Sequence, residues 1–470
     1  MKGEDALVAL SSSDYLVVAL YMCAVLVVGY RAARRQSGSP EDYLLAGRRL
    51  TLPMFVATLV SSWYGGILGV GEFSYRYGLS QWVVFGVPYY VFAFVFAFAL
   101  ASRVHASKAV TIPDRLRDAY GPGAAYLGAF YAFLMTNPAP YMLMVAVLLQ
   151  LMFGGSLFVL MLVGTLISTI YLRIGGFRSV TATNYLEFGM MYLGFALLVP
   201  FCIHHYGGMG FLRASLPELH LTWHGGNSLQ SIVVWFFIAL WTLVDPGFHQ
   251  RCEAATSGTV ARWGILVSIA FWFVFDAMTV TSGLYARAIL PNLDQPSLAY
   301  PALASVVLPP ILRGVFFVGM LATIMSTLVS FSFIAGQTLG RDLIWRAFGG
   351  DEIVATRLGL LLALFLGGLL ALILPSVVDL WYAVGSAVVP GLLIPLLSTY
   401  WFPLRMSHPR LPVAMMALSS LASLGSLLWG HARLVDGIPH YPFGIEPFYP
   451  GLFLSGLMVL LDRVLVRRAA

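Results

Sequence analysis

Three polar segments interrupt an apolar chain, and their residue types could bind a cation or a small solute. They are Ser61-Ser62-Trp63-Tyr64-Gly65-Gly66, Asp245-Pro246-Gly247, and a hydroxyl stripe at Thr323, Ser326, Thr327 and Ser330. The stripe has the i, i+3, i+4, i+7 spacing that places residues on one helix face. Hydroxyls and freed backbone carbonyls are oxygen ligands of the kind that a hard cation such as Na+ takes. The alternative is that these hydroxyls bond to their own helix or to a neighbouring one.

Carboxylates within apolar stretches form a second group of candidates. Glu187, Asp245 and Asp276 lie inside such stretches, and Glu72 and Asp379 lie nearer to their ends. Ionisable groups inside a membrane are costly and are usually functional or paired. For Asp245, a structural ion pair with Arg251 is the alternative to a role in binding.

The elements that must position these residues are membrane helices. Of the 470 residues, 59% are hydrophobic and only 10% are charged, against about 25% charged residues in an average soluble domain. Apolar runs of about 20 residues, the length that spans a bilayer, recur along the chain and do not alternate as barrel strands do. The formal charge of +6 comes from basic residues in short loops. It therefore indicates topology rather than nucleic-acid binding.

We predict an all-α polytopic membrane protein with about 13 spans in a single transmembrane domain, residues 1–470. The approximate limits of the spans are 14–33, 51–75, 80–103, 122–153, 156–174, 179–204, 228–250, 260–288, 310–338, 355–375, 378–401, 411–430 and 447–466. The span at 122–153 is expected to kink or break at Asn137-Pro138-Ala139-Pro140, because proline interrupts a helix. Most of the 27 Lys and Arg residues fall on the cytoplasmic side if the N-terminus is outside and the C-terminus is inside.

The second and seventh spans each contain a Gly or Pro interruption, and they enter the membrane from opposite sides. Each opens a set of five spans, so we expect an inverted-repeat transporter with a first repeat at 51–204 and a second at 228–401. Residues 1–50 then supply an extra N-terminal helix, and residues 402–470 supply two C-terminal helices. Tight helix packing around small residues is the alternative explanation of each glycine cluster.

Four segments carry a resemblance to a known family. They are VTIPDRLRDAYG (110–121), GGFRSVTATNYLEF (175–188), DPGFHQRCEAATS (245–257) and ATIMSTLVSFSFIAGQTLGRDL (322–343). With the spacing of the spans over residues 14–405, they resemble the sodium/solute symporter family, which includes the sodium/proline and sodium/sugar symporters. The resemblance implies an inverted-repeat fold of the LeuT type with broken helices. It also implies uptake of a small organic solute driven by the Na+ gradient.

The resemblance further implies which residues bind Na+, the co-transported ion. These are the backbone carbonyls of Ser61, Tyr64 and Thr323 and the hydroxyls of Ser326 and Thr327. Asn184 stands where some members have an aspartate for an additional Na+, and Val329 stands where they have a serine. We therefore expect one Na+ per solute. Glu187 replaces a frequent glutamine and could supply a compensating carboxylate or a proton site.

The solute pocket is expected near the membrane midplane, with contributions from the second, third, seventh and eleventh spans. Its candidate residues are Trp63, Tyr64, Glu72, Tyr89, Tyr90, Trp241, Asp245 and Tyr382. Aromatic rings and carboxylates suit an amine or a zwitterion through cation–π contact and charge. A neutral polyol or sugar stays open.

The predicted function is Na+-coupled symport by alternating access in a bacterial inner membrane. The alternatives are proton coupling through Glu187 or Asp245, and a solute-binding membrane transducer. An enzyme is not expected, because the chain has no HExxH metal motif and no clear nucleophile motif; it also lacks the GxxxxGK[ST] loop of an ATP-driven pump. The expected partners are Na+, the solute and the lipid bilayer, with no nucleic acid and no obligatory protein partner.

Overall fold

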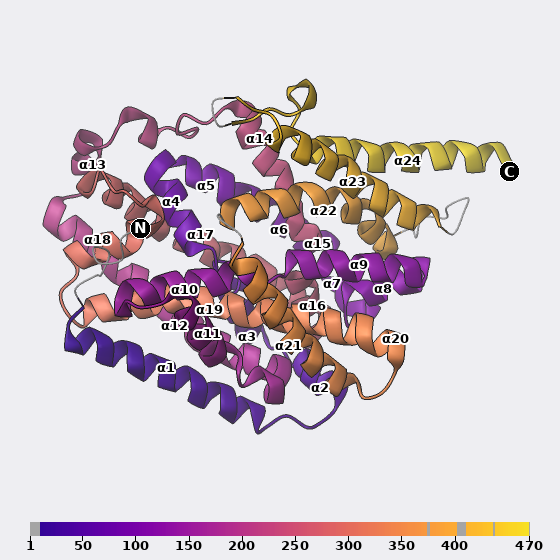
Figure 1. The fold of residues 1–470 in the computed structure, drawn as a ribbon, viewed down its shortest axis with the longest axis horizontal. Helices are drawn as coiled ribbons and strands as arrows, with labels where there is room; N and C mark the ends of the chain where they lie inside the picture. The colour runs from indigo at the N-terminus through magenta and orange to yellow at the C-terminus, as the bar shows by residue number, and fades with distance from the viewer. Residues whose placement is uncertain (1–9, 374–376, 402–409, 436–437, 470) are drawn as a thin grey trace.

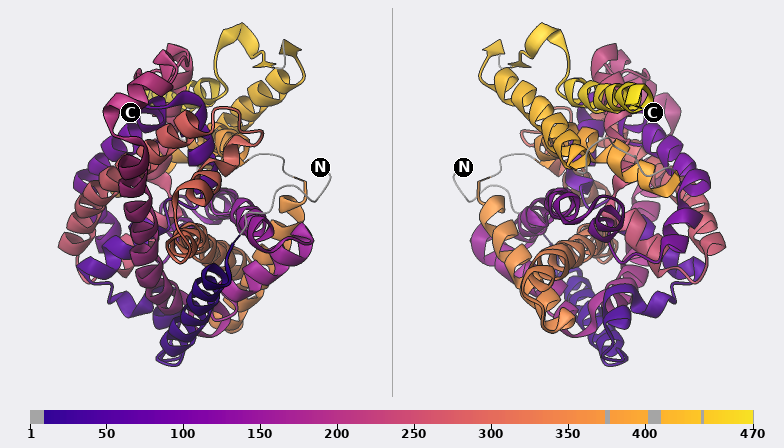
Figure 2. Two further views of the ribbon diagram at one scale, coloured as in Figure 1. Left: turned by 90° about the vertical axis from the view of Figure 1, so that its left-hand side faces the viewer. Right: turned by 90° about the vertical axis from the view of Figure 1, so that its right-hand side faces the viewer.

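The computed structural model describes residues 10–373, 377–401, 410–435 and 438–469, and these are mostly helical. Many of the helices run along one common direction (Figure 1), and several are seen end-on when the bundle is turned (Figure 2). Ten helices in the described residues are long and apolar enough to cross a membrane. The predicted all-α membrane fold is therefore confirmed.

The first half of the chain forms the helices α1 (Ser12–Ala33), α2 (Pro40–Leu45), η1 (Ala46–Arg48), α3 (Leu52–Ser61), α4 (Ile67–Tyr77), α5 (Ser80–Phe85), α6 (Val87–Ala99), α7 (Ala101–Ser107), α8 (Ile112–Tyr120), α9 (Pro122–Met135), α10 (Ala139–Phe153), α11 (Leu157–Thr169), α12 (Leu172–Tyr206) and α13 (Met209–Ser215). The second half forms η2 (Glu218–Leu221), α14 (Leu229–Ile238), α15 (Trp241–Val244), α16 (Pro246–Ala254), α17 (Gly258–Ile289), η3 (Pro296–Leu298), α18 (Ala299–Val307), α19 (Leu312–Gln337), η4 (Thr338–Trp345), α20 (Arg346–Phe348), α21 (Glu352–Ala371), α22 (Val377–Trp401), α23 (Leu411–His431), η5 (Pro442–Gly444) and α24 (Phe448–Ala469). A short antiparallel hairpin pairs β1 (Leu434–Val435) with β2 (Ile438–Pro439).

Polar side chains in the sequence fix where several of these helices begin. Ser11 and Asp14 form a reciprocal capping box at the start of α1, which satisfies backbone donors that would otherwise have no partner. Side-chain oxygens also cap α8, α16, α17 and α21, and they come from Thr111, Asp245, Ser257 and Asp351. The cap on α16 determines the geometry of the candidate site, because Asp245 lies in the second predicted break.

Both predicted helix breaks are present. α3 ends at Ser61 and α4 begins at Ile67, so the peptide between them is not helical. Asp245 is extended, with φ −66° and ψ 120°, and separates α15 from α16. A residue that precedes proline disfavours the helical conformation, so Pro246 accounts for this break. The span predicted at 122–153 is also broken, since α9 ends at Met135 and α10 begins at Ala139.

The number of spans stays a prediction. The second predicted span is divided between α3 and α4, and α11 has only 13 residues, so neither region supplies a helix of 18 residues or more. α24 is long enough but is not among the ten helices selected by length and hydropathy in the described residues.

α19 lies at the centre of the bundle, and nearly all of its residues are buried. It packs closely on α12, where Gly194 and Gly319 bring the two backbones together. A Cβ atom on Gly319 would lie 2.9 Å from the carbonyl oxygen of Met190. Small residues at this crossing therefore permit the close approach that membrane helices use in place of a hydrophobic driving force.

Backbone hydrogen bonds connect the starts of the two halves of the bundle. The N–H of Leu50, just before α3, donates to the carbonyl of Ala254 at 3.0 Å, and the N–H of Thr256 donates to the carbonyl of Leu50 at 3.1 Å. The segment that leads into the first broken helix is thus joined to the segment that leaves the second.

The bundle has two distinct ends. α13 and α18 lie at one end, called the α18 end, and α8 and α20 lie at the other, called the α20 end (Figure 1). α1 begins towards the α18 end, and α24 finishes towards the α20 end (Figure 1). The first described helix therefore begins at one end of the bundle and the last described helix finishes at the other, as an odd number of spans requires.

Candidate functional site

The hydroxyl stripe of α19 meets the first helix break directly. The hydroxyl of Ser326 donates to the carbonyl of Ser61 at 2.7 Å and also lies 3.0 Å from the carbonyl of Thr323. All three residues are buried. Ser61 is the last residue of α3, so its carbonyl is free because the helix stops there. The break therefore supplies the carbonyl oxygen of Ser61, and α19 supplies the hydroxyl of Ser326 that donates to it.

Thr327 adds a second hydroxyl to this cluster. Its Oγ1 atom lies 3.5 Å from the carbonyl of Thr323, and its side chain packs against Gly65. A Cβ atom on Gly65 would clash with the Thr327 side chain, and one on Gly66 would clash with the indole of Trp381. The two glycines therefore let α19 and α22 approach the break from two sides.

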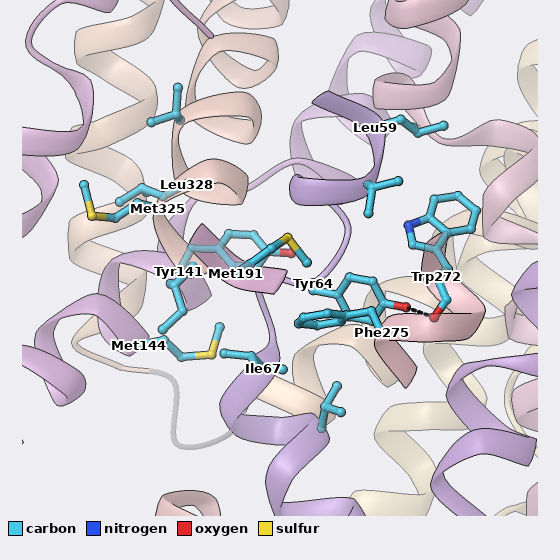
Figure 3. Packing of buried hydrophobic residues seen from close by; sticks show 14 of the residues in the cluster. Leu59, Tyr64, Ile67, Tyr141, Met144, Met191, Trp272, Phe275, Met325 and Leu328 are labelled. Atoms are coloured by element: carbon cyan, nitrogen blue, oxygen red, sulfur yellow. Dashed lines mark hydrogen bonds between the residues drawn. The ribbon is translucent and has the colours of Figure 1, made fainter. Parts of the chain in front are cut away.

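The side chain of Tyr64 contacts α17. Its hydroxyl donates to the carbonyl of Trp272 at 3.2 Å, and its ring centroid lies 4.5 Å from that of Phe275 (Figure 3). This contact anchors the break to α17. The role of the Tyr64 carbonyl as an ion ligand stays a prediction.

The oxygens brought together here fit Na+. The carbonyls of Ser61 and Thr323 and the hydroxyls of Ser326 and Thr327 are uncharged oxygen donors, and hard cations bind oxygen. A hydroxyl that donates its proton to a carbonyl keeps its lone pairs for a cation. The structure thus brings four of the five predicted ligand groups close together. They come from segments about 260 residues apart in the sequence.

A second polar cluster surrounds the fully buried side chain of Arg251. Its Nη2 atom donates to the hydroxyls of Ser62 at 3.0 Å and Ser330 at 3.1 Å, and it lies 3.4 Å from the hydroxyl of Thr58. Its Nη1 atom donates to the carbonyl of Gly247 at 3.2 Å. Arg251 therefore links α16 to α3 and α19. A Cβ atom on Gly247 would lie 2.8 Å from Oδ1 of Asp245 and 3.2 Å from Nη1 of Arg251. The two charged groups are therefore neighbours, although no ion pair within 4 Å joins them in the described structure.

Asn184 continues this cluster towards Glu187. The Asn184 amide oxygen accepts from the hydroxyls of Thr58 at 2.8 Å and Ser330 at 3.0 Å, and the amide nitrogen donates to Oε2 of Glu187 at 3.1 Å. The same two hydroxyls accept from Arg251, so donors and acceptors alternate along the chain of bonds. Glu187 is fully buried, and its Oε1 atom has no partner in the described structure. Asn184 and Glu187, the two residues considered for a second cation or a proton, thus belong to one hydrogen-bond network.

A cavity opens beside the two helix breaks and encloses about 750 Å³ of empty space, its open mouth included. Five of the predicted pocket residues line it, and they are Trp63, Tyr64, Tyr89, Trp241 and Asp245. Asp245 accepts from the backbone N–H of Phe248 at 2.9 Å and from the indole N–H of Trp241 at 3.1 Å.

Comparison with known proteins decides between a transporter and the other predicted classes. The model for the sodium:solute symporter family matches residues 43–386 of this chain. The chain belongs to the sodium:solute symporter family. The symporter is therefore a transporter and not an enzyme, and Na+ is the ion that it co-transports with a small solute.

Individual relatives agree with this assignment. The symporter is 27% identical to a sodium/pantothenate symporter of Haemophilus influenzae, over 87% of this chain and 89% of the relative. It is 23% identical to the osmoregulated proline transporter OpuE of Bacillus subtilis, over 96% and 94%. Among solved structures, a substrate-bound, outward-open Na+-coupled sialic acid symporter matches with a TM-score of 0.76 and 14% identity, covering 97% of each chain. The nucleobase-cation-symport-1 transporter Mhp1 matches with a TM-score of 0.59 and 13% identity, covering 92% and 96%. These structures confirm the predicted inverted-repeat fold.

Three other pocket candidates do not line the cavity. Glu72 is half-exposed on α4 and pairs with Arg76 at 3.0 Å. Tyr90 donates to Asp276 and accepts from Trp82, so it lies behind the cavity wall. The third, Tyr382, packs on the lining residue Trp235 but does not itself line the cavity.

Tyr382 donates its hydroxyl to Glu446, and its ring packs on Trp235. Burial raises the pKa of the Glu446 carboxyl above its usual range, and the hydrogen bond from Tyr382 opposes that rise. The neighbouring residue, Trp381, lines the cavity instead. Successive residues of a helix differ by about 100° in direction, so the pocket prediction missed the correct face of α22 by one position.

Several cavity residues were not predicted as pocket residues. Asp276 was noted only as an intramembrane carboxylate, and Gln81 and Trp381 were not singled out at all. Other lining residues are Gly66, Val70, Phe85, Tyr141, Trp235, Ile238 and Phe331. A glutamine inside an apolar run can indicate a pocket residue, because a buried amide needs hydrogen-bond partners. The aromatic residues give no such signal in a chain that is 14% aromatic.

Ion pairs connect several helices at the α20 end. Arg341 of η4 contacts Asp114 of α8 at 2.7 Å and Glu352 of α21 at 2.6 Å, and Arg346 contacts Asp114 at 2.8 Å. The hydroxyl of Thr111 donates to Asp342 at 2.9 Å. These bonds join η4, α8, α20 and α21 at the end of the bundle opposite to α18.

We expect Arg341→Gln to loosen this end. Hydrogen bonds to charged groups contribute about 1.5–3 kcal/mol each, so amide exchange in residues 112–120 should rise at least about tenfold. Hydrogen–deuterium exchange with mass spectrometry measures this. Glu41→Gln is the control, because Glu41 is largely exposed in its pair with Arg48. Equal amide exchange in Arg341→Gln and the parent protein would show that the ion pairs of Arg341 do not stabilise the α20 end.

Proposed function

We propose that the symporter binds Na+ at Ser61, Tyr64, Thr323, Ser326 and Thr327 and binds a small organic solute in the adjacent cavity. The observation that carries this proposal is the 2.7 Å bond from Ser326 to the Ser61 carbonyl. It brings a free carbonyl of the first broken helix to the hydroxyl stripe of α19. Helix breaks that face a cavity are where secondary transporters place ions and solutes.

The two sites share one short segment, and this accounts for coupling. Ser61 belongs to the proposed ion site, whereas Trp63 and Tyr64 line the cavity. An ion that fixes the break against α19 therefore also fixes two walls of the solute site. Coupling requires that each ligand binds one conformation better than the other. Na+ from outside would favour the conformation with a formed cavity, and low Na+ inside would favour release.

One Na+ per solute is the stoichiometry that we propose. The hydroxyls of Thr58 and Ser330 and the amide of Asn184 could coordinate a second cation if an aspartate stood at position 184. In this chain, the guanidinium of Arg251 already supplies positive charge to those hydroxyls. A second Na+ beside a buried guanidinium would be repelled.

The membrane arrangement is part of the proposal. We place the N-terminus outside and the C-terminus inside the plasma membrane of a bacterium, which puts most Lys and Arg residues on the cytoplasmic side. The α18 end then faces outwards, and the paired charges of the α20 end close the cytoplasmic side. The single transmembrane domain comprises an extra helix in 1–50, a first repeat in 51–204, a second repeat in 228–401 and two further helices in 402–470.

Thermal stability of the detergent-purified protein tests this function. We expect Na+, but not K+ at equal ionic strength, to raise the apparent melting temperature. A screen of amino acids, amines, sugars and carboxylates should give further stabilisation only in Na+, because a ligand that binds the folded state stabilises it. Solute stabilisation that is equal in K+ and varies with pH would favour proton coupling through Glu187. No response to Na+ would contradict the proposed ion site.

A further inference from the structure

The ionisable groups of the cavity lining are acidic. Two carboxylates, Asp245 and Asp276, line it, and no Lys, Arg or His is among its lining residues in the described structure. Carboxylates in a water-poor site are costly unless an opposite charge or several hydrogen bonds compensate them. The lining therefore favours one sign of solute charge over the other.

The nearest buried cation, Arg251, is not among the residues that line the cavity. Arg251 directs Nη2 to Ser62 and Ser330 and Nη1 to the carbonyl of Gly247, so its guanidinium faces α3 and α19. Asp245 is stabilised by two hydrogen bonds, from Phe248 and Trp241. Asp245 thus accepts from donors of α15 and α16 and has the guanidinium of Arg251 as a neighbour, without a direct ion pair in the described structure.

Asp276 is the less compensated of the two carboxylates. Its Oδ2 atom accepts from the hydroxyl of Tyr90, but its Oδ1 atom has no partner in the described structure. The residue is almost fully buried and lies on the cavity wall. A buried charged group that lacks a partner inside the protein is the kind that a ligand completes.

Aromatic rings form most of the remaining wall. Four indoles line the cavity, from Trp63, Trp235, Trp241 and Trp381. The face of an aromatic ring attracts a cation, and tryptophan does so most strongly. Indoles combined with two carboxylates make a site that suits a positively charged head group and disfavours a carboxylate.

Gln81 adds a polar contact that the protein leaves open. It is fully buried on α5, it lines the cavity, and neither its amide nitrogen nor its amide oxygen has a partner in the described structure. Buried amides are normally hydrogen-bonded. Gln81 can therefore both donate to and accept from a hydroxyl or amide on the solute.

Resting on the symport function proposed above, we propose that the transported solute is a small organic cation, an amine or quaternary ammonium compound with a hydrogen-bonding group. Asp276 neutralises its charge, the indoles surround its head group, and Gln81 bonds its polar end. The solute would then differ in charge from pantothenate, which the relative from Haemophilus influenzae carries.

A charge series tests the inference on the full-length protein. The probes are choline as the cation, 3,3-dimethylbutan-1-ol as its neutral isostere, proline as a zwitterion and pantothenate as an anion. Tryptophan fluorescence reports binding in Na+ and in K+, because four indoles line the cavity. We expect choline to bind at least tenfold more tightly than its neutral isostere, and only in Na+.

Variants separate the role of Asp276 from the general effect of charge. Asp276→Asn should weaken choline binding at least tenfold and leave the neutral isostere unchanged. Glu72→Gln is the matched control, because it removes a carboxylate that lies outside the cavity. If Asp276→Asn does not fold, the charge series on the parent protein still tests whether the cavity prefers a cation. Na+-dependent binding of proline or pantothenate without binding of choline would overturn the inference and leave symport intact. Absence of choline binding in Na+ would overturn the inference, and the effect of Na+ alone on the melting temperature tests the proposed ion site separately.

Discussion

Replacing Ser326 and Thr327 together by alanine is expected to abolish the stabilisation of the symporter by Na+. Each substitution removes one hydroxyl oxygen, and Ser326→Ala also removes the 2.7 Å bond to the Ser61 carbonyl. Contacts to charged groups contribute about 1.5–3 kcal/mol each, which corresponds to roughly tenfold to hundredfold in affinity per hydroxyl. The two effects need not add, because the residues share one site.

Binding of radioactive Na+ and the Na+ dependence of thermal stability both measure this loss. Ser332→Ala is the matched control, since Ser332 is buried on the same helix and its hydroxyl has no partner in the described structure. The control should retain the Na+ affinity of the parent protein. If the double variant keeps that affinity as well, the ion site lies elsewhere.

Replacing Arg251 by leucine is expected to cause the largest loss of stability among single substitutions at the site. The guanidinium is fully buried and donates to groups on α3, α16 and α19. Removal of one member of a buried charged network costs about 3–5 kcal/mol, because the remaining charges and polar groups lose their partner. Asp245 would then remain buried beside Gly247 without a neighbouring cation.

The apparent melting temperature in detergent reports this effect. Arg262→Leu is the control, because Arg262 is only partly buried and lies over the exposed ring of Phe98. Arg251→Lys should recover only part of the stability, since an ammonium group cannot reproduce the planar fork of a guanidinium. A melting temperature of Arg251→Leu equal to that of the parent protein would show that the network contributes little.

Local sequence signals predicted the positions of the helix breaks. Glycine and proline act on the backbone within one or two residues, so Gly65, Gly66 and Pro246 indicate where helices stop without any knowledge of the fold. The hydroxyl stripe was equally visible, because its 3.6-residue period belongs to a single helix. Both features follow from rules that act over a few neighbouring positions.

Tertiary contacts were harder to predict. The short separation of Asp245 and Arg251 suggested an ion pair, but Asp245 turns its carboxylate back to cap α16 while Arg251 reaches α3 and α19. Tyr90 was placed in the pocket, yet it lies behind Asp276. Ser330 orients Arg251 from 79 residues away, and Asp276 orients Tyr90 from 186 residues away. One sequence does not reveal such pairs.

The backbone link at Leu50 has a consequence for how the symporter can change over evolutionary time. Its two hydrogen bonds, with Ala254 and Thr256, involve only main-chain atoms, so they persist whichever side chains occupy these positions. Only proline at Leu50 or Thr256 would delete a donor. Substitutions of the residues that line the cavity therefore leave the atoms of this connection between the two broken helices in place.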